Sequence, residues 1–244
     1  MKHMRNDLRR ALLAALLLAA GGALAQENDA GGNPRDPYEG FNRAMFAVNE
    51  AVDKYAAKPV AQAYDHVTPL PVKAAVGNFF GNVGDLWVGV NNALQGKPAD
   101  AGNDFARLLI NSTVGIFGLF DVASELEFEH HDEDFGQTLA VWGVGDGGYV
   151  VLPLLGPRTM RDTAALGVDY LADPMRQVDP VAVRNGAGVV RFVDIRASLL
   201  PSDTVVDQAA LDKYAYIRDA YLQRRRNQIY DGRPPRLDDD FADE

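Results

Sequence analysis

The sequence contains no cysteine, which excludes a disulfide framework and a thiolate metal site. It has only four histidines, and its 24 basic residues are outnumbered by 34 acidic ones. An anionic surface of this kind repels nucleic acid and gains no electrostatic attraction from anionic lipid. Any binding to a membrane must therefore draw its free energy from the burial of apolar side chains.

The motifs of common enzymes are also missing. There is no G-x-S-x-G nucleophile elbow, no phosphate-binding loop that ends in Lys-Ser or Lys-Thr, and no H-E-x-x-H zinc motif. The stretch EFEHHDEDF (127–135) places His130 and His131 before acidic residues that are able to bind a metal. Neighbouring residues on a helix point about 100° apart, so adjacent imidazoles rarely converge on one ion. We interpret this stretch as a solvated polar loop and predict a protein that is not an enzyme and binds no metal or cofactor.

The first 25 residues have the three parts of an export signal. Residues 1–10 are basic, residues 11–20 (ALLAALLLAA) are apolar, and Ala23-Leu24-Ala25 has the small-x-small pattern of a cleavage site. Ten apolar residues are too few to span a bilayer, which needs about 20. Removing these 25 of the 244 residues removes four basic residues and one acidic one, and leaves 20 against 33, a net charge of −13. Export together with the absence of disulfides suits a bacterial periplasmic protein.

Three segments are expected after the export signal. We predict a flexible leader over 26–35, a single helical domain over 36–230 and an acidic, disordered tail over 231–244. The 219 residues that remain after cleavage are enough to form one domain with its own core.

Apolar periodicity predicts a mainly α-helical domain. One stripe, with spacings of 4, 3, 4 and 3, is typical of a helix that is capped by Asp36 and ends before Pro59. A long helix is expected from Ser202 or Asp203 to Ile229, with Arg224–Arg226 as a solvated cluster near its end. The best candidate for a strand is 188–195. The residues of the first stripe are Phe41, Met45, Val48, Val52 and Tyr55.

Three runs carry almost no charge and contain glycine and amide residues. They are 86–96, 108–120 and 135–157, and Asp146 is the single charged residue of the third run. A helix of 11 residues is about 16 Å long, roughly half of a hydrocarbon core of about 30 Å. Such segments are either buried core helices or apolar elements that enter one leaflet or lie flat in it. Both interpretations remain open for each run.

Several long blocks strongly resemble the MlaA/VacJ family, and together they cover roughly 36–226. They are DPYEGFNRAMFAVNEAVDKYAAKPVA (36–61), NFFGNVGD (78–85), VNNALQGK (90–97), ARLLINSTVGIFGLFDVAS (106–124), DFGQTLAVWGVGDGGYVVLPLLGPRTMRD (134–162) and DKYAYIRDAYLQRRR (212–226).

The resemblance implies a ring-shaped assembly of short, Gly/Pro-interrupted amphipathic helices around an amphipathic channel, in the inner leaflet of the bacterial outer membrane. It implies contact with a trimeric porin. It also implies a function in lipid asymmetry: mislocalised phospholipid is removed from the outer leaflet and passed to a soluble periplasmic lipid carrier, from which an inner-membrane ATP-driven complex receives it. No nucleic acid is implied as a partner.

One feature departs from the family pattern. Family members are typically lipoproteins with a lipobox cysteine, whereas the corresponding region here reads LLLAAGGALAQENDA. We therefore expect no acylation, and residence at the periplasmic face of the outer membrane through apolar side chains and the porin. A single acyl chain gives only marginal membrane binding in any case.

Residue types, rather than the resemblance, suggest three sets of functional positions. The proposed apolar belt against lipid consists of Leu86, Trp87, Val90, Ile116, Phe117, Leu119 and Phe120. The proposed polar lining, either of a channel or at bilayer depth, consists of Asn91, Asn92, Asn111, Ser112 and Thr113. The proposed hinge of a gating segment consists of Gly143, Gly145, Gly147 and Gly148.

Two other classes of function compete with lipid transfer. A soluble periplasmic lipid-binding or chaperone-like protein would remain in the soluble fraction when membranes are separated. A metal-dependent hydrolase that uses His130 and His131 would lose its activity when both histidines are replaced by alanine.

Overall fold

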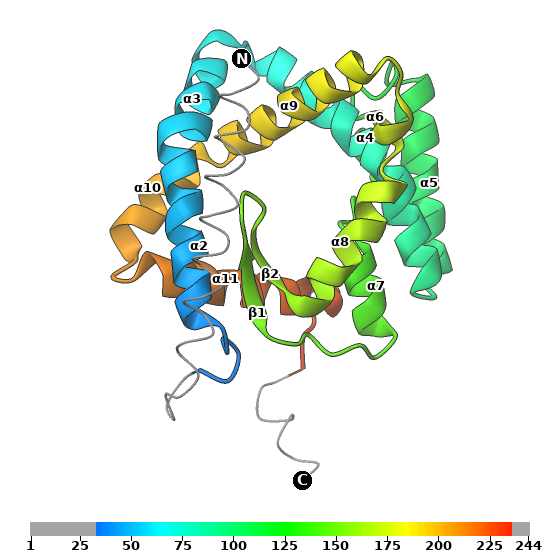
Figure 1. The fold of residues 1–244 in the computed structure, drawn as a ribbon. Coiled ribbons are helices and arrows are strands. Elements are labelled where there is room, and N and C mark those ends of the chain that lie inside the picture. Colours follow the sequence, from blue (N-terminus) through cyan, green and yellow to red (C-terminus); the bar gives the residue numbers. More distant parts are fainter. Residues whose placement is uncertain (1–32, 236–244) are drawn as a thin grey trace.

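The computed structural model describes residues 33–235 (Figure 1). These residues are mainly helical, as predicted, with one small β-hairpin. The expected export signal, nearly all of the leader and the end of the tail lie outside them. Among the helices of this part of the chain, none is both long and apolar enough to cross a membrane.

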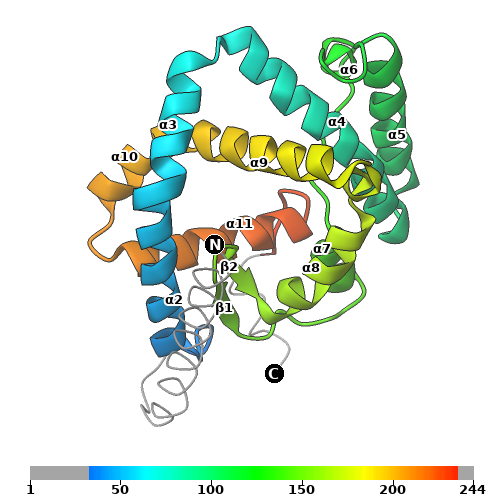
Figure 2. The same cartoon turned by 45° about the horizontal axis from the view of Figure 1, so that its top comes forward.

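The helices form a closed frame around the hairpin (Figures 1 and 2). One side is a nearly continuous rod of α2 (Glu39–Val52), the π-helical turn η1 (Asp53–Ala57) and α3 (Lys58–Val67). The prediction that the first helix ends before Pro59 is therefore wrong. Pro59 lies in the first turn of α3, and the wider π-helical turn before it accommodates the proline ring that normally ends a helix.

The opposite side consists of two helices packed side by side. They are α4 (Leu70–Leu94) and α5 (Pro98–Thr113), followed by the short α6 (Val122–Glu125). Although α4 contains several glycines, it continues unbroken for 25 residues. A Cβ at Gly89 would lie 2.9 Å from Cε1 of Phe105, so this glycine allows α5 to approach closely. Gly89 therefore serves helix packing rather than helix interruption.

The hairpin lies inside the frame and was not predicted. It follows α7 (Phe135–Val141) and consists of β1 (Tyr149–Leu152) and β2 (Gly156–Thr159), which pair antiparallel with Tyr149 opposite Thr159. Its turn places Leu154 and Gly156 at φ values of +64° and +75°, and such a left-handed turn allows the chain to reverse. α8 (Met160–Ala172) begins directly after β2.

The remaining helices return to the starting side and close the frame. They are the 3₁₀ turn η2 (Pro174–Gln177), α9 (Val181–Ser198), α10 (Leu200–Ala209) and α11 (Lys213–Ile229). The strand expected at 188–195 is wrong, because this segment lies within α9. The long helix expected to end at Ile229 is divided in two, because Ala210 is extended and Asp212 caps a new helix by accepting a hydrogen bond from the backbone N–H of Ala215.

The N-terminal end of α11 joins it to the start of the chain. Asp36, which was expected to cap a helix, is instead buried and accepts hydrogen bonds from Tyr214 Oη at 2.5 Å and Arg218 Nη1 at 3.1 Å. Asn42 also donates to Asp36, at 2.8 Å, and its amide bonds to the backbone of Tyr149 and Val151 in β1. A single buried carboxylate thus connects α11, α2 and the hairpin.

The C-terminal half of α11 makes a second connection, to α7 and α8. Asp162 accepts hydrogen bonds from Tyr221 Oη at 2.6 Å and from Arg225 Nη2 at 2.8 Å, and Arg225 Nη1 donates to Asp134 at 2.7 Å. Although burial alone would raise the pKa of Asp162, the charge and hydrogen bonds of Arg225 and the hydrogen bond of Tyr221 lower it. Gly136 is packed so closely here that a Cβ would lie 2.5 Å from Arg225 Nη2.

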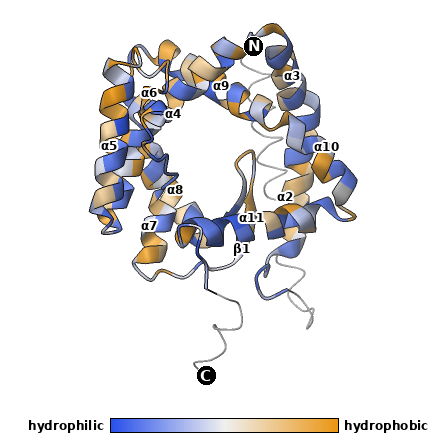
Figure 3. Cartoon of the chain, turned by 180° about the vertical axis from the view of Figure 1, so that it is seen from behind, coloured by the Kyte–Doolittle hydropathy of each residue, from blue (hydrophilic) through white to orange (hydrophobic). Residues whose placement is uncertain are grey.

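The arginine cluster is therefore only partly solvated, which corrects the expectation from sequence. Arg225 is buried, whereas the side chain of Arg224 is 74% exposed and bonds weakly to Asp132 at 3.3 Å. The hydrophilic colour of α11 in Figure 3 reflects a helix whose inward face is formed largely by polar groups that bond to the frame.

We predict that Arg225→Ala lowers the free energy of unfolding by about 3 kcal/mol, because Asp134 loses its ion-pair partner and the buried carboxylate of Asp162 loses one of its two, retaining Arg161. Arg224→Ala is the matched control, and an exposed pair of this kind contributes roughly 0–1 kcal/mol. Urea unfolding followed by circular dichroism measures both. Equal losses in the two variants would show that α11 does not close the frame through Arg225.

Candidate functional site

The segment after α5 is an apolar loop, residues 114–120, whose side chains face solvent. Phe117 is 77% exposed and Ile116 is 54% exposed, and Val114, Leu119 and Phe120 are also exposed. Backbone hydrogen bonds hold the loop against the end of α5, including Gly118 N–H to the Asn111 carbonyl at 2.8 Å. An exposed cluster of large apolar side chains on an acidic protein indicates a surface that is covered by lipid or by another protein.

The backbone of the apolar loop is unusual as well. Ile116, Phe117 and Gly118 have φ values of +53°, +58° and +83°, three consecutive residues in the left-handed region. A β-branched residue such as isoleucine rarely adopts this conformation. Gly118 is also packed so tightly that a Cβ there would lie 2.6 Å from Nδ2 of Asn82. Such strain persists only where surrounding contacts impose it, which is common at functional sites.

The other residues of the proposed apolar belt lie on α4. Leu86 is exposed, whereas Trp87 and Val90 are half-buried. The indole Nε1–H of Trp87 donates to Asp169 Oδ1 of α8 at 2.8 Å. Trp87 therefore joins two helices of the frame, while Leu86 and the apolar loop present most of the exposed area of this set.

A further set of exposed apolar residues lies on α9 and was not predicted from the sequence. Charged residues lie between these side chains along the helix, so no long uncharged run marks them in the sequence. The exposed members are Val181, Val183, Val189, Val190, Phe192 and Ile195.

The three asparagines of the proposed polar lining are buried, and their amides bond to the protein itself. Asn91 accepts a hydrogen bond from Thr138 Oγ1 at 2.8 Å, and Asn92 donates to Asp104 Oδ2 at 2.7 Å. Asn111 donates to Asp121 Oδ1 at 2.9 Å and accepts from the backbone N–H of Ala123.

The two hydroxyl residues of the same set lie nearer the surface. Ser112 is half-buried and accepts a hydrogen bond from Asn82 Nδ2 at 3.0 Å, and Thr113 is exposed and donates to the Leu109 carbonyl at 2.6 Å. All five polar residues therefore have partners within the wall formed by α4, α5, α7 and the start of α6.

The four glycines of the proposed hinge lie in the loop between α7 and β1. Gly143 has a φ of +91°, and a Cβ at either Gly143 or Gly145 would meet no atom within 4 Å. A Cβ at Gly147 would lie 2.9 Å from Met160, and one at Gly148 would lie 2.7 Å from Pro37. Space for movement is thus found at the start of the loop, whereas its end is packed against α8 and the start of α2.

A polar pocket of about 370 Å³ lies behind the apolar loop, between α4, α5, the start of α6 and the 126–134 segment. Asn78 on its wall donates from Nδ2 to the Leu119 carbonyl at 3.2 Å, which joins the pocket directly to the loop. The residues that line the pocket are Gly77, Asn78, Gly81, Asn82, Asp85, Arg107, Asn111, Asp121, Ser124 and His130.

Arg107 organises one side of the pocket and is only 3% exposed. Its Nη2 donates to both carboxylate oxygens of Asp121 at 3.1 Å, and its Nη1 donates to Ser124 Oγ and to the Phe128 carbonyl. Its Nε has no hydrogen-bond partner within the described residues and lies 3.7 Å from Asp85 Oδ2. Burial would raise the pKa of Asp121, but hydrogen bonds from Ser124, Asn111 and Arg107 lower it to about 2.

Asp85 occupies the opposite side and is 2% exposed. Its nearest positive or ionisable neighbours are Arg107 Nε at 3.7 Å and His130 Nδ1 at 3.6 Å, both beyond hydrogen-bond distance. Burial raises the pKa of Asp85 to about 7, opposed by the charge of Arg107 and reinforced by Asp104 and Asp121. A buried carboxyl group of this kind is a frequent marker of a functional site.

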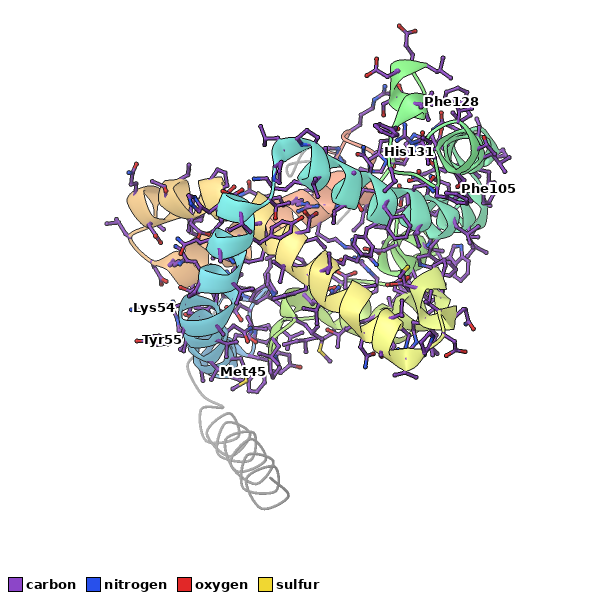
Figure 4. The ribbon with its side chains drawn as sticks, turned by 90° about the horizontal axis from the view of Figure 1, so that it is seen from above. Met45, Lys54, Tyr55, Phe105, Phe128 and His131 are labelled. Carbon is purple, nitrogen blue, oxygen red and sulfur yellow. The ribbon has the colours of Figure 1, made fainter. Side chains whose placement is uncertain are left out.

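The polar stretch around the two histidines is less solvated than predicted. His131 Nδ1 lies 2.7 Å from Asp104 Oδ1, and the buried Glu133 accepts a hydrogen bond from Gln95 Nε2 at 2.7 Å. Figure 4 shows His131 and Phe128 beside α4 and α5, near Phe105. Across residues 33–235, no group of three or more His, Cys, Asp or Glu side chains is placed to hold a metal ion.

The sequence contained a signal for this pocket that was not used. Three charged residues that line the pocket stand at the ends of the uncharged runs. Asp85 precedes 86–96, while Arg107 and Asp121 flank 108–120. The boundaries of the runs, rather than the runs themselves, therefore mark the polar site.

Comparison with known protein families finds a family model that matches most of the chain. A model of the family described as "MlaA lipoprotein" matches residues 34–228. The chain belongs to the MlaA family. A relative from Shigella flexneri named "Intermembrane phospholipid transport system lipoprotein MlaA" is 37% identical over 194 residues, which are 78% of this chain and 76% of the relative. A relative of the same name from Haemophilus influenzae is 32% identical over 233 residues, 91% of this chain and 90% of the relative.

A solved structure agrees with this family assignment. It is described as the structural basis for maintenance of bacterial outer membrane lipid asymmetry. It matches the present fold with a TM-score of 0.69 at 35% sequence identity, and the match covers 78% of this chain and 96% of that one. The resemblance inferred from the sequence blocks is thereby confirmed.

We predict that Asp85→Asn stabilises the protein more at pH 8 than at pH 5. Between pH 3.8 and about 7 the folded state binds more protons at Asp85 than the unfolded state does, so wild-type stability falls as the pH rises through this range. Asparagine does not ionise and avoids that loss. Thermal unfolding at both pH values measures the effect.

Glu125→Gln, an exposed carboxylate on the neighbouring α6, is the control for that measurement and should show no such pH-dependent gain. A change in Tm for Asp85→Asn that is the same at pH 5 and pH 8 would mean that the Asp85 carboxyl titrates like an exposed one.

Proposed function

We propose that this protein is a non-enzymatic component of intermembrane phospholipid transport. It removes mislocalised phospholipid from the outer leaflet of the outer membrane through a central channel, and passes it to a soluble periplasmic lipid carrier. The names of its relatives and the lipid-asymmetry structure that shares its fold support this proposal. The observation that carries it is the exposed apolar loop at 114–120 beside a polar pocket, an arrangement suited to an amphiphile.

The physical problem is the transfer of a hydrated head group past hydrocarbon. Charged groups lose several kcal/mol or more of solvation when they enter the bilayer core without partners. A protein that lowers this cost needs an apolar surface toward the tails and polar groups toward the head group. In our proposal, the apolar loop and Leu86 supply the first, and the frame of helices around the hairpin supplies a protected passage.

Membrane residence follows from the same surface. Full burial of one large apolar side chain contributes about 1.5–3 kcal/mol, so the partly covered side chains of the apolar loop together supply on the order of 5 kcal/mol. This suffices to hold an acidic protein at the periplasmic face of the outer membrane with the help of a trimeric porin. The buried amides of Asn91, Asn92 and Asn111 serve in this proposal to satisfy polar groups within the wall, as hydrocarbon requires.

The loop between α7 and β1 is proposed as the movable part of the passage. Gly143 and Gly145 have the open surroundings that a change of backbone angles needs, and the hairpin that follows lies inside the frame (Figure 1). Gly147 and Gly148, which are packed, mark the fixed end of this segment.

The direct test is deletion of the gene followed by measurement of phospholipid in the outer leaflet. We expect surface phospholipid to rise and to return to its original level when the gene is restored. Unchanged surface phospholipid would contradict the proposal. If the mature protein left the membrane fraction in mild salt and behaved as a detergent-free monomer, the soluble periplasmic lipid-binding alternative would be favoured instead.

We predict that the double variant Ile116→Ser/Phe117→Ser reduces membrane association and fails to restore outer-leaflet asymmetry in the deletion strain. The substitutions remove exposed apolar area and leave the buried core intact, so stability should change by about 1 kcal/mol or less. Leu211→Ser is the control, because Leu211 is an even more exposed apolar residue between α10 and α11, away from the apolar loop. Equal membrane association of both variants and the wild type would contradict the proposed role of the loop.

A further inference from the structure

The polar pocket has an excess of hydrogen-bond acceptors. Asn82 is 6% exposed and lines the pocket, yet its Oδ1 has no hydrogen-bond partner within the described residues. The carboxylate of Asp85 likewise accepts no hydrogen bond from any of these residues, since its ion-pair partners are 3.6 and 3.7 Å away. Asn82 and Asp85 are three residues apart on α4, so they project from the same face of this helix. Two buried acceptor groups in this pocket therefore lack a hydrogen-bond donor among the described residues, which is energetically costly.

The charge of the pocket favours a cation. Two carboxylates, Asp85 and Asp121, line it against one guanidinium, that of Arg107. The terminal nitrogens of Arg107 already donate to Asp121, Ser124 and the Phe128 carbonyl, and they have no free capacity to hold an anion. A phosphate group would meet Asp85 at close range, and the Nε of Arg107, which is unpartnered within residues 33–235, already lies 3.7 Å from the Asp85 carboxylate. A positively charged N–H donor, by contrast, bonds to both acceptors.

The position of the pocket beside the apolar loop indicates which kind of molecule carries the cationic group. Asn78 of its wall donates a hydrogen bond to Leu119 in the apolar loop, and Asn82 donates one to Ser112 in the last turn of α5, just before the loop. Gly77 and Gly81 on the same face of α4 have no side chain to fill the space, and its volume of about 370 Å³ is in the range of small-ligand sites. An amphiphile with acyl chains on the apolar loop therefore has its polar end beside Asp85.

We propose that this pocket binds the primary ammonium group of a phospholipid head group, with Asp85 as its charge partner and Asn82 Oδ1 as a second acceptor. The site rests on the proposed function and adds to it a preference among head groups. The ammonium enters the pocket, and the phosphate diester stays at the mouth, where it remains hydrated. A quaternary ammonium has no N–H to donate, so it is a poorer ligand.

The test uses the full mature chain in a mild non-ionic detergent and isothermal titration calorimetry. The probes are dioctanoyl phosphatidylethanolamine, phosphatidylcholine and phosphatidylglycerol, and free ethanolamine. We expect the ethanolamine lipid to bind at least tenfold more tightly than the glycerol lipid, with the choline lipid between them. Free ethanolamine at millimolar concentration should compete with the ethanolamine lipid in the wild-type protein, an observation that needs no variant.

Asp85→Asn keeps the shape of the side chain and should reduce the tenfold preference to less than twofold. Glu125→Gln removes a charge from the same region without lining the pocket, and should keep the preference. Unfolding curves establish that both variants are folded. Asn82→Leu, which removes the second acceptor, should lower the preference for the ethanolamine over the choline lipid.

The outcomes separate the possible ligands. Equal affinities of the wild type for the three lipids, or a full preference retained in Asp85→Asn, would overturn the ammonium site. Free ethanolamine that binds as tightly as the lipid would overturn the lipid source and assign the pocket to a soluble amine. A wild type that transfers phosphatidylglycerol between vesicles without head-group preference would leave the proposed transport intact, whereas transfer of none of the lipids would count against the proposed function itself.

Discussion

The fold depends on two buried carboxylates that α11 reaches from one face. Tyr214 and Arg218 bond to Asp36, and about two helical turns later Tyr221 and Arg225 bond to Asp162. Each carboxylate thus receives one phenol and one guanidinium from α11; the Asn42 amide also bonds to Asp36 and the Arg161 guanidinium to Asp162. Such a set of donors satisfies a buried charge. These bonds tie the segment before α2 and the start of α8 to α11, the last helix of the frame.

The charges at the ends of the apolar run 108–120 are paired as well. In our proposal this run lies against lipid, where no water solvates charged groups, so the charges at its boundaries need partners inside the protein. Arg107 and Asp121 flank the run that contains the apolar loop and bond to each other, which draws the two ends of the loop together. The pocket behind the loop arises from this closure, and the unused acceptors of Asn82 and Asp85 lie where the closure leaves space.

Sequence reasoning predicted the helical class and the family, because each depends on local periodicity or on long blocks that resemble the family. It left open whether Ile116 and Phe117 are buried or exposed, since an uncharged run is compatible with both. It did not predict the hairpin, since an apolar YVVL segment followed by glycine and proline is equally compatible with a buried helix. It also misplaced Asp36 and Arg225, whose local patterns are those of a cap and a solvated cluster. Both residues owe their burial to partners more than 60 positions away, which no local pattern contains.

The bonds between Asp36 and α11 join residues separated by 178 and 182 positions. A chain synthesised from its N-terminus therefore has to be nearly complete before these two segments meet. Contacts of such long range form slowly. We expect the docking of α11 onto Asp36 to be a late step of folding, a consequence of connectivity rather than of any single residue.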